Sequence, residues 1–127
     1  MNTEQQQPSL TLSDQERVEI EARCLELAKE KNVAKVYPYV AIRPTDGERI
    51  IAYVSEPNYQ TKLHLMDKAV ALGQHAAAEE YREMCLIREA SHPLTYANTP
   101  DADPYKLGVV AKCLETITMV MDVFKKK

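Results

Sequence analysis

The spacing of hydrophobic and polar residues first becomes regular at Ser13. Glu16 follows three residues later, which is the spacing of a helix capping box. The residues that follow predict an amphipathic helix over about residues 13–31. Its apolar positions are Val18, Ala22, Leu25 and Ala28, with Ile20, Cys24 and Leu27 extending the same side.

Residues 37–59 predict one β-hairpin, because they show the two-residue alternation of β-strands and carry the turn sequence "PTDGE" in their middle. Gly47 suits the positive-φ position of a three-residue hairpin loop. That register places Ile42 opposite Ile50, Val40 opposite Ala52, and Tyr39 opposite Tyr53. One face of the hairpin would then be aliphatic and the other would carry tyrosines. Pro38 has no N–H to donate, so its strand is expected to be an edge.

Three further helices are expected after the hairpin. The first has Ser55 as its cap and Pro57 in its first turn, and its apolar side is Leu63, Met66, Ala69, Val70 and Leu72. Beyond Gly73, a second helix over about residues 74–90 would turn inward Ala77, Tyr81, Met84, Cys85 and Ile87. Asp103 caps the last helix, with Pro104 at its first position. Its apolar residues are Leu107, Val110, Ala111, Leu114, Ile117, Met121 and Phe124.

This order of elements predicts the fold class. A helix, a hairpin and then three helices make a helix-dominated α+β domain with one antiparallel β-hairpin. We expect one domain over residues 12–127, because that length can bury a single core. Residues 1–11 are polar and rich in glutamine, so we expect a disordered N-terminal tail.

Charge and targeting signals narrow the function. The formal net charge is −3, which disfavours nucleic acid as a partner because that affinity depends on Lys and Arg. No apolar run has the length of a membrane span, and the start lacks the pattern of a signal peptide. We therefore expect a cytoplasmic protein. Cys24, Cys85 and Cys113 are odd in number and lie among apolar helix residues, so we interpret them as buried hydrophobes.

Motifs for chemistry are missing from the sequence. It has no CxxC or HxxxH metal pattern, and Gly47, Gly73 and Gly108 form no phosphate-binding loop. Its carboxylates fit solvated helix faces. We expect no metal, no cofactor and no catalytic residue, and hence no enzyme.

The tyrosines of the hairpin remain as candidate contact residues. Tyr37, Tyr39, Tyr53 and Tyr59 gather at the hairpin and its exit. Either helices pack on them or they form a protein-contact surface, since tyrosine is enriched in interfaces. A two-stranded ribbon also presents two unpaired edges. Self-association through these edges, or a strand added by a partner, would pair them.

Three segments make up the layout of the later part of the chain: "RPTDGERIIAYVSEP" with Pro57 after the second strand, the helical pair "LHLMDKAVALGQHAAAEEYREMCLI", and the closing helix "VAKCLETITMVMDVFKKK". This layout resembles small phage proteins of the tail-assembly chaperone type. The resemblance covers about residues 34–127, and the helix over residues 13–31 lies outside it. It implies a protein that holds the tape-measure protein and recruits tail-tube subunits in the host cytoplasm, with no cofactor.

Three other functions stay open at this point. One is a minor structural protein of the virion, which needs similar surfaces. Another is a bacterial adaptor or inhibitor module, such as an antitoxin-like protein. The last is a small enzyme whose site, built around His64 or His92, forms only in a multimer.

Overall fold

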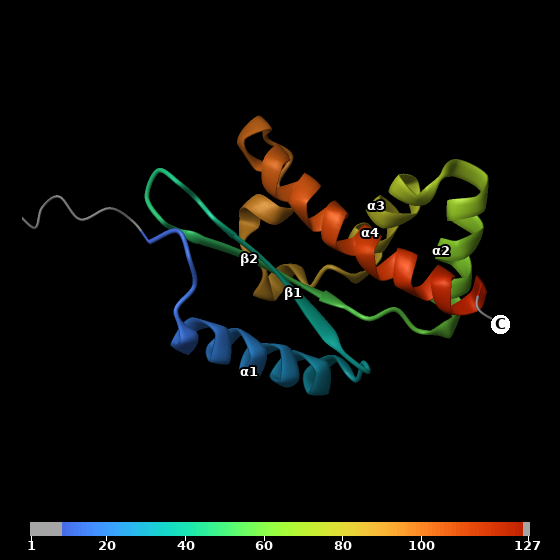
Figure 1. Ribbon diagram of the computed structural model, residues 1–127, viewed down its shortest axis with the longest axis horizontal. Helices are drawn as coiled ribbons and strands as arrows, with labels where there is room; N and C mark the ends of the chain where they lie inside the picture. Colours follow the sequence, from blue (N-terminus) through green and yellow to red (C-terminus); the bar gives the residue numbers. More distant parts are fainter. Residues whose placement is uncertain (1–8, 126–127) are drawn as a thin grey trace, which may run out of the picture.

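A computed structural model describes the backbone of residues 9–125 and the side chains of residues 9–119. The elements in order are α1 (Asp14–Lys31), β1 (Val36–Ile42), β2 (Arg49–Ser55), α2 (Tyr59–Leu72), α3 (Gln74–Cys85) and α4 (Asp103–Lys125). Three single-turn 3₁₀ helices, Arg88–Ala90, Pro93–Thr95 and Pro100–Ala102, connect α3 to α4. Figure 1 shows the hairpin between α1 on one side and α4 on the other, with α2 and α3 at one end. The predicted α+β fold class is confirmed.

Helix α1 begins where the sequence predicts. The Ser13 hydroxyl accepts a hydrogen bond from the Glu16 amide at 3.1 Å, and the Glu16 carboxylate accepts one from the Ser13 amide at 2.9 Å. This is the complete capping box. Asn32 ends the helix in the left-handed conformation, with φ at 55°. The buried side of α1 is narrower than predicted, because only Ile20, Cys24 and Leu27 are buried.

The strand register differs by one residue from the prediction. Ile50 lies opposite Ala41, Ala52 opposite Tyr39, and Tyr53 opposite Pro38. The loop holds four residues, 44–47, because Arg43 and Glu48 form the last backbone-paired positions through a 2.9 Å bond from the Arg43 amide. Gly47 does adopt the expected positive φ, 74°.

The physical reason for this register lies in the side chain of Arg43. Its guanidinium bonds both carboxylate oxygens of Asp46, at 3.0 and 2.9 Å, and also bonds Glu48. Asp46 in turn accepts the Glu48 amide at 3.0 Å. These contacts hold one more residue in the loop than a three-residue turn has. A one-residue slip moves every side chain of one strand to the other face relative to its partner.

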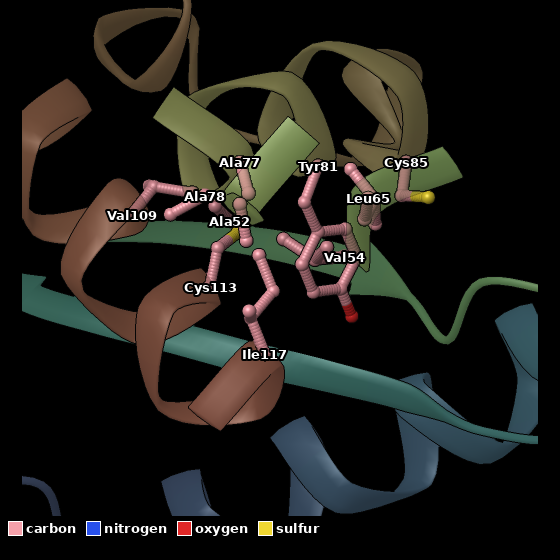
Figure 2. Close-up of a cluster of buried hydrophobic side chains, with 11 residues drawn as sticks. Ala52, Val54, Leu65, Ala77, Ala78, Tyr81, Cys85, Val109, Cys113 and Ile117 are labelled. Carbon is pink, nitrogen blue, oxygen red and sulfur yellow. The ribbon is translucent and has the colours of Figure 1, made fainter. Parts of the chain in front are cut away.

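The hairpin therefore has two buried faces of mixed composition. One face packs against α1 through a cluster of Ile20, Cys24, Leu27, Val36, Tyr53 and Ile87. The other packs against α3 and α4, and Figure 2 shows β2 contributing Ala52 and Val54 to this larger cluster. Tyr81 of α3 and Cys113 of α4 lie within it, both 1% exposed. The prediction of one aliphatic and one tyrosine face is wrong.

The predicted helix ends need three corrections. Asn58, and not Ser55, caps α2, because its side chain accepts the Thr61 amide at 2.9 Å while Ser55 is still in β2. Helix α3 ends at Cys85, since the residues that follow pair with β2. Asp103 is itself helical, because a 3₁₀ turn runs directly into α4.

The buried faces of the later helices are also rotated from the prediction. Helix α2 buries Leu65 and Ala69 and leaves Leu63, Val70 and Leu72 exposed.

Helix α4 buries Val109, Cys113, Thr116 and Ile117, while Leu107 is exposed. In α3, Ala77, Tyr81 and Cys85 are buried as expected, but Met84 is exposed. The side chains of Met121 and Phe124 lie outside the described residues. Each helix has apolar residues on more than one side, so tertiary packing decides which side is buried.

Candidate protein-contact surface

The four candidate tyrosines lie in different surroundings. Tyr53 is 7% exposed and packs in the α1 cluster. Tyr39 is half-buried beside the other cluster, and its ring lies against Gly108 of α4. The Tyr37 hydroxyl donates to Glu56 at 3.0 Å. Tyr59 alone is widely exposed, at 66%. The structure does not bring the four together on one face, and their role in binding a partner stays a prediction.

The outer edge of β2 is closed by residues 86–92. The Ile87 amide donates to the Tyr53 carbonyl and the His92 amide to the Ile51 carbonyl, both at 2.8 Å. The Tyr53 amide donates to the Ser91 hydroxyl at 3.0 Å. The sequence predicts two unpaired hairpin edges that could pair with another chain. The outer edge of β2 is not one of them, because residues 86–92 already pair with it.

The outer edge of β1 is open in the described part of the chain. Backbone bonds between Arg43 and Glu48 and between Lys35 and Glu56 mark the two ends of the ladder. Alternate residues of an antiparallel strand turn their N–H and C=O groups away from the partner strand. In β1 these are Val36, Pro38, Val40 and Ile42, and no outward hydrogen bond of theirs is found among the described residues. Pro38 lies on this edge, as the sequence predicts.

An apolar groove runs beside the N-terminal half of this edge, between α1 and β1. Its volume is about 420 Å³ and its lining is Glu21, Cys24, Leu25, Ala28, Ala34, Lys35, Val36, Tyr37 and Pro38. Leu25 is 70% exposed at its border. The hydrophobic pattern of the sequence does not predict this groove. One feature of the sequence does point to it: the apolar residues of α1 cover more of the helix surface than a two-stranded hairpin can bury.

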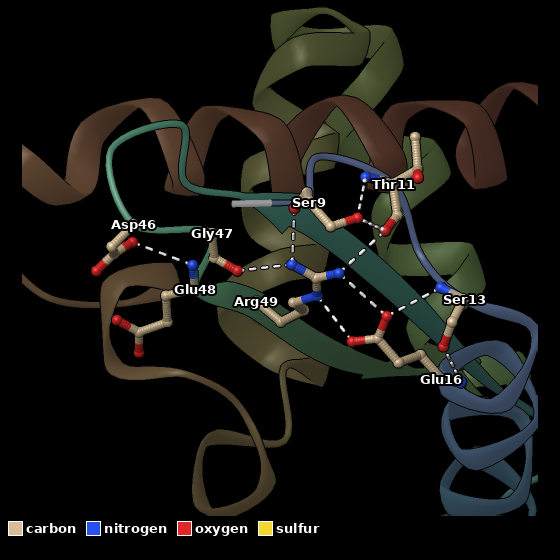
Figure 3. A network of polar contacts seen from close by, with 8 residues as sticks. All are labelled: Ser9, Thr11, Ser13, Glu16, Asp46, Gly47, Glu48 and Arg49. Carbon is tan, nitrogen blue, oxygen red and sulfur yellow. Dashed lines mark hydrogen bonds and ion pairs between the residues drawn. The ribbon is translucent and has the colours of Figure 1, made fainter. Parts of the chain in front are cut away.

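Arg49 fixes α1 and the preceding segment onto the hairpin. Its guanidinium bonds the Glu16 carboxylate at 2.7 and 3.1 Å and also the carbonyls of Ser9, Thr11 and Gly47 (Figure 3). The same contact lowers the pKa of the Glu16 carboxyl to about 2. Residues 9–11, which the sequence places in its tail, are joined to the hairpin in this way. Residues 1–8 lie outside the described residues.

The three cysteines are buried, and two of the three histidines contact a carboxylate. Burial raises the pKa of all three cysteine thiols, and that of Cys113 to about 12. His64 contacts Glu80 at 3.0 Å and His92 contacts Glu48 at 2.7 Å, both within this chain. Among the side chains of residues 9–119, no three His, Cys, Asp or Glu are placed to hold a metal ion. None of the helices described here has the length and apolar character needed to cross a membrane.

Neither a family model, nor a curated protein, nor a solved structure matches this chain.

Proposed function

We propose that this protein is non-enzymatic and works by binding another protein in the groove between α1 and β1. The observation that carries the proposal is the open edge of β1 beside an apolar groove. Unpaired strand edges are recognised by extended segments of partner proteins, whose main chain pairs with the edge and whose side chains enter neighbouring pockets.

Pro38 divides this edge into two parts with different chemistry. Val40 and Ile42 offer N–H and C=O groups to a partner strand, whereas Pro38 offers only its carbonyl. A partner segment would therefore pair with the C-terminal half of β1 and continue past Pro38 through side-chain contacts with Cys24, Leu25 and Ala28. The proline also limits regular pairing of β1 with copies of itself, since proline on an edge blocks such pairing.

The partner class that we propose first is a phage tail protein. It comes from the resemblance of residues 34–127 to tail-assembly chaperones, which implies the tape-measure protein or a tail-tube subunit as the bound protein. An extended or unfolded segment of such a protein fits an edge-and-groove site.

The test is affinity capture of tagged protein from phage-infected cells, with quantitative mass spectrometry of the bound proteins. Leu25→Glu puts a charge at the border of the groove. Val18→Glu is the matched control, because Val18 is also exposed on α1, at 63%, and does not line the groove. We expect the wild type and Val18→Glu to retain a tail protein that Leu25→Glu loses. If all three proteins retain the tail protein, the groove is not its binding site. If none of them captures a tail protein, the proposed partner class is wrong.

A further inference from the structure

Helix α2 carries a stripe of four apolar side chains that belong to neither buried cluster. The stripe consists of Tyr59, Leu63, Met66 and Val70, spaced by four, three and four residues. At 3.6 residues per turn, these positions lie within a sector of about 60°. Tyr59 is 66% exposed and Val70 is 82% exposed, while Met66 is half-buried. The buried residues of the helix, Leu65 and Ala69, lie to one side of the stripe.

The spacing is that of the contact positions in a pair of supercoiled helices. Tyr59 and Met66 take the d positions of a heptad, and Leu63 and Val70 take the a positions. Lys62 is then at g and Asp67 at the following e position. In parallel pairs, a g residue faces the e residue five positions later on the partner helix. Lys62 of each copy would face Asp67 of the other.

These two flanking charges are able to form that contact. The Lys62 ammonium is 3.2 Å from Glu56, and it has three donors, so it can bond a second carboxylate. Asp67 is exposed and makes no ion pair with any described residue. We propose that the stripe on α2 binds the same stripe of a second copy of this chain, with the two helices parallel.

The position of the rest of the molecule favours the parallel arrangement. The protein body packs against α2 on the side of Leu65 and Ala69, next to the stripe. A two-fold axis along the helices places the two bodies on opposite sides of the helix pair. An axis perpendicular to the helices places both bodies on the same side, where they would collide.

The size of the contact sets its strength. The stripe has only four residues, so two copies bury less than the ~1,200 Å² of the smallest standard stable interfaces. A pair of helices with about one and a half heptads is also short. The dimer is therefore reversible and concentration-dependent. The stripe lies outside the groove between α1 and β1, so dimer formation does not depend on the function proposed above.

Sedimentation equilibrium of the full chain tests the dimer between about 10 µM and about 1 mM. We expect the average mass of the wild type to rise from 14.4 kDa towards twice that value. Val70→Glu should stay monomeric, and Asp67→Lys should weaken association at least ~3-fold by facing Lys62 with a like charge. Leu107→Glu is the control, because Leu107 is 67% exposed on α4, and it should behave as the wild type.

Disulfide trapping tests the orientation. The described cysteines are buried, so a cysteine introduced at position 70 is the reactive thiol. Parallel helices place Val70 opposite Val70, and Val70→Cys should cross-link to itself far faster than Leu107→Cys. A wild type that stays monomeric at about 1 mM, or equal cross-linking of the two variants, would overturn the proposal.

Discussion

At the scale of single residues, burial determines the reactivity of the three cysteine thiols. Cys24, Cys85 and Cys113 lie in the two clusters on either face of the hairpin. Desolvation disfavours the thiolate and is the largest cause of the raised pKa of each thiol. Since the thiolate is the reactive form, we expect all three thiols to react slowly in the folded protein.

We predict that the thiols of the folded protein react with an aromatic disulfide reagent at least ~100-fold more slowly than those of the unfolded chain. Cys113 should be the slowest, because burial raises its pKa to about 12. The rates can be followed by absorbance, with Cys113→Ala and Cys24→Ala variants assigning each phase. Rapid reaction of one thiol in the native protein would show an accessible thiolate at that position.

Packing between elements explains why α4 carries a glycine in its interior. A Cβ at position 108 would lie 2.0 Å from the hydroxyl oxygen and 2.5 Å from the Cζ atom of Tyr39. Gly108 thus allows α4 to approach β1 closely, and the tyrosine ring fills the space above it. Tyr39, a candidate contact residue in the sequence, has a packing role between these two elements.

Gly108→Ala should therefore destabilise the protein by about 1–3 kcal/mol, because overpacking outweighs the higher helix propensity of alanine. In a Tyr39→Leu background the ring is gone, and the same substitution should stabilise by up to about 1 kcal/mol. Urea unfolding of the four proteins measures both effects. An increase in stability in both backgrounds would show that α4 and Tyr39 do not pack as closely as described.

At the scale of the whole molecule, one carboxylate–guanidinium contact joins α1 to the hairpin, and another closes the hairpin loop. Glu16 and Arg49 connect α1 with the hairpin, and Asp46 and Arg43 close its loop. Each arginine lowers the pKa of its carboxyl to about 2, from ordinary values of 4.5 for Glu16 and 3.8 for Asp46. A lowered folded-state pKa contributes stability above the unfolded-state pKa, and protonation removes it.

We predict that the urea midpoint of the wild type falls as the pH is lowered from about 5 to about 2. Glu16→Gln should have a lower midpoint at neutral pH and a shallower decline below pH 5, because one of the linked carboxyls is gone. Glu19→Gln, which alters an exposed residue of the same helix, should follow the wild-type curve. Parallel curves for the wild type and Glu16→Gln would show that the Glu16–Arg49 contact does not stabilise the fold.

The sequence by itself determined the types and order of the elements. The capping box at Ser13 and Glu16 placed the start of α1, and Gly47 marked the turn. Gly73 marked the break between α2 and α3. These are local signals, in which a side chain bonds its own backbone or a glycine supplies a positive φ. They do not depend on what lies across the molecule.

Only the tertiary structure decided which sides of the elements are buried. The observed register differs by one residue from the predicted one, and it places Tyr39 and Tyr53 on opposite faces of the hairpin. Residues 86–92 closed the edge of β2 from a distant part of the sequence, leaving β1 as the open edge. Val18, Leu25 and Val70 have the same apolar character as buried residues on their helices. Their exposure follows from a hairpin and a core too small to cover every apolar side.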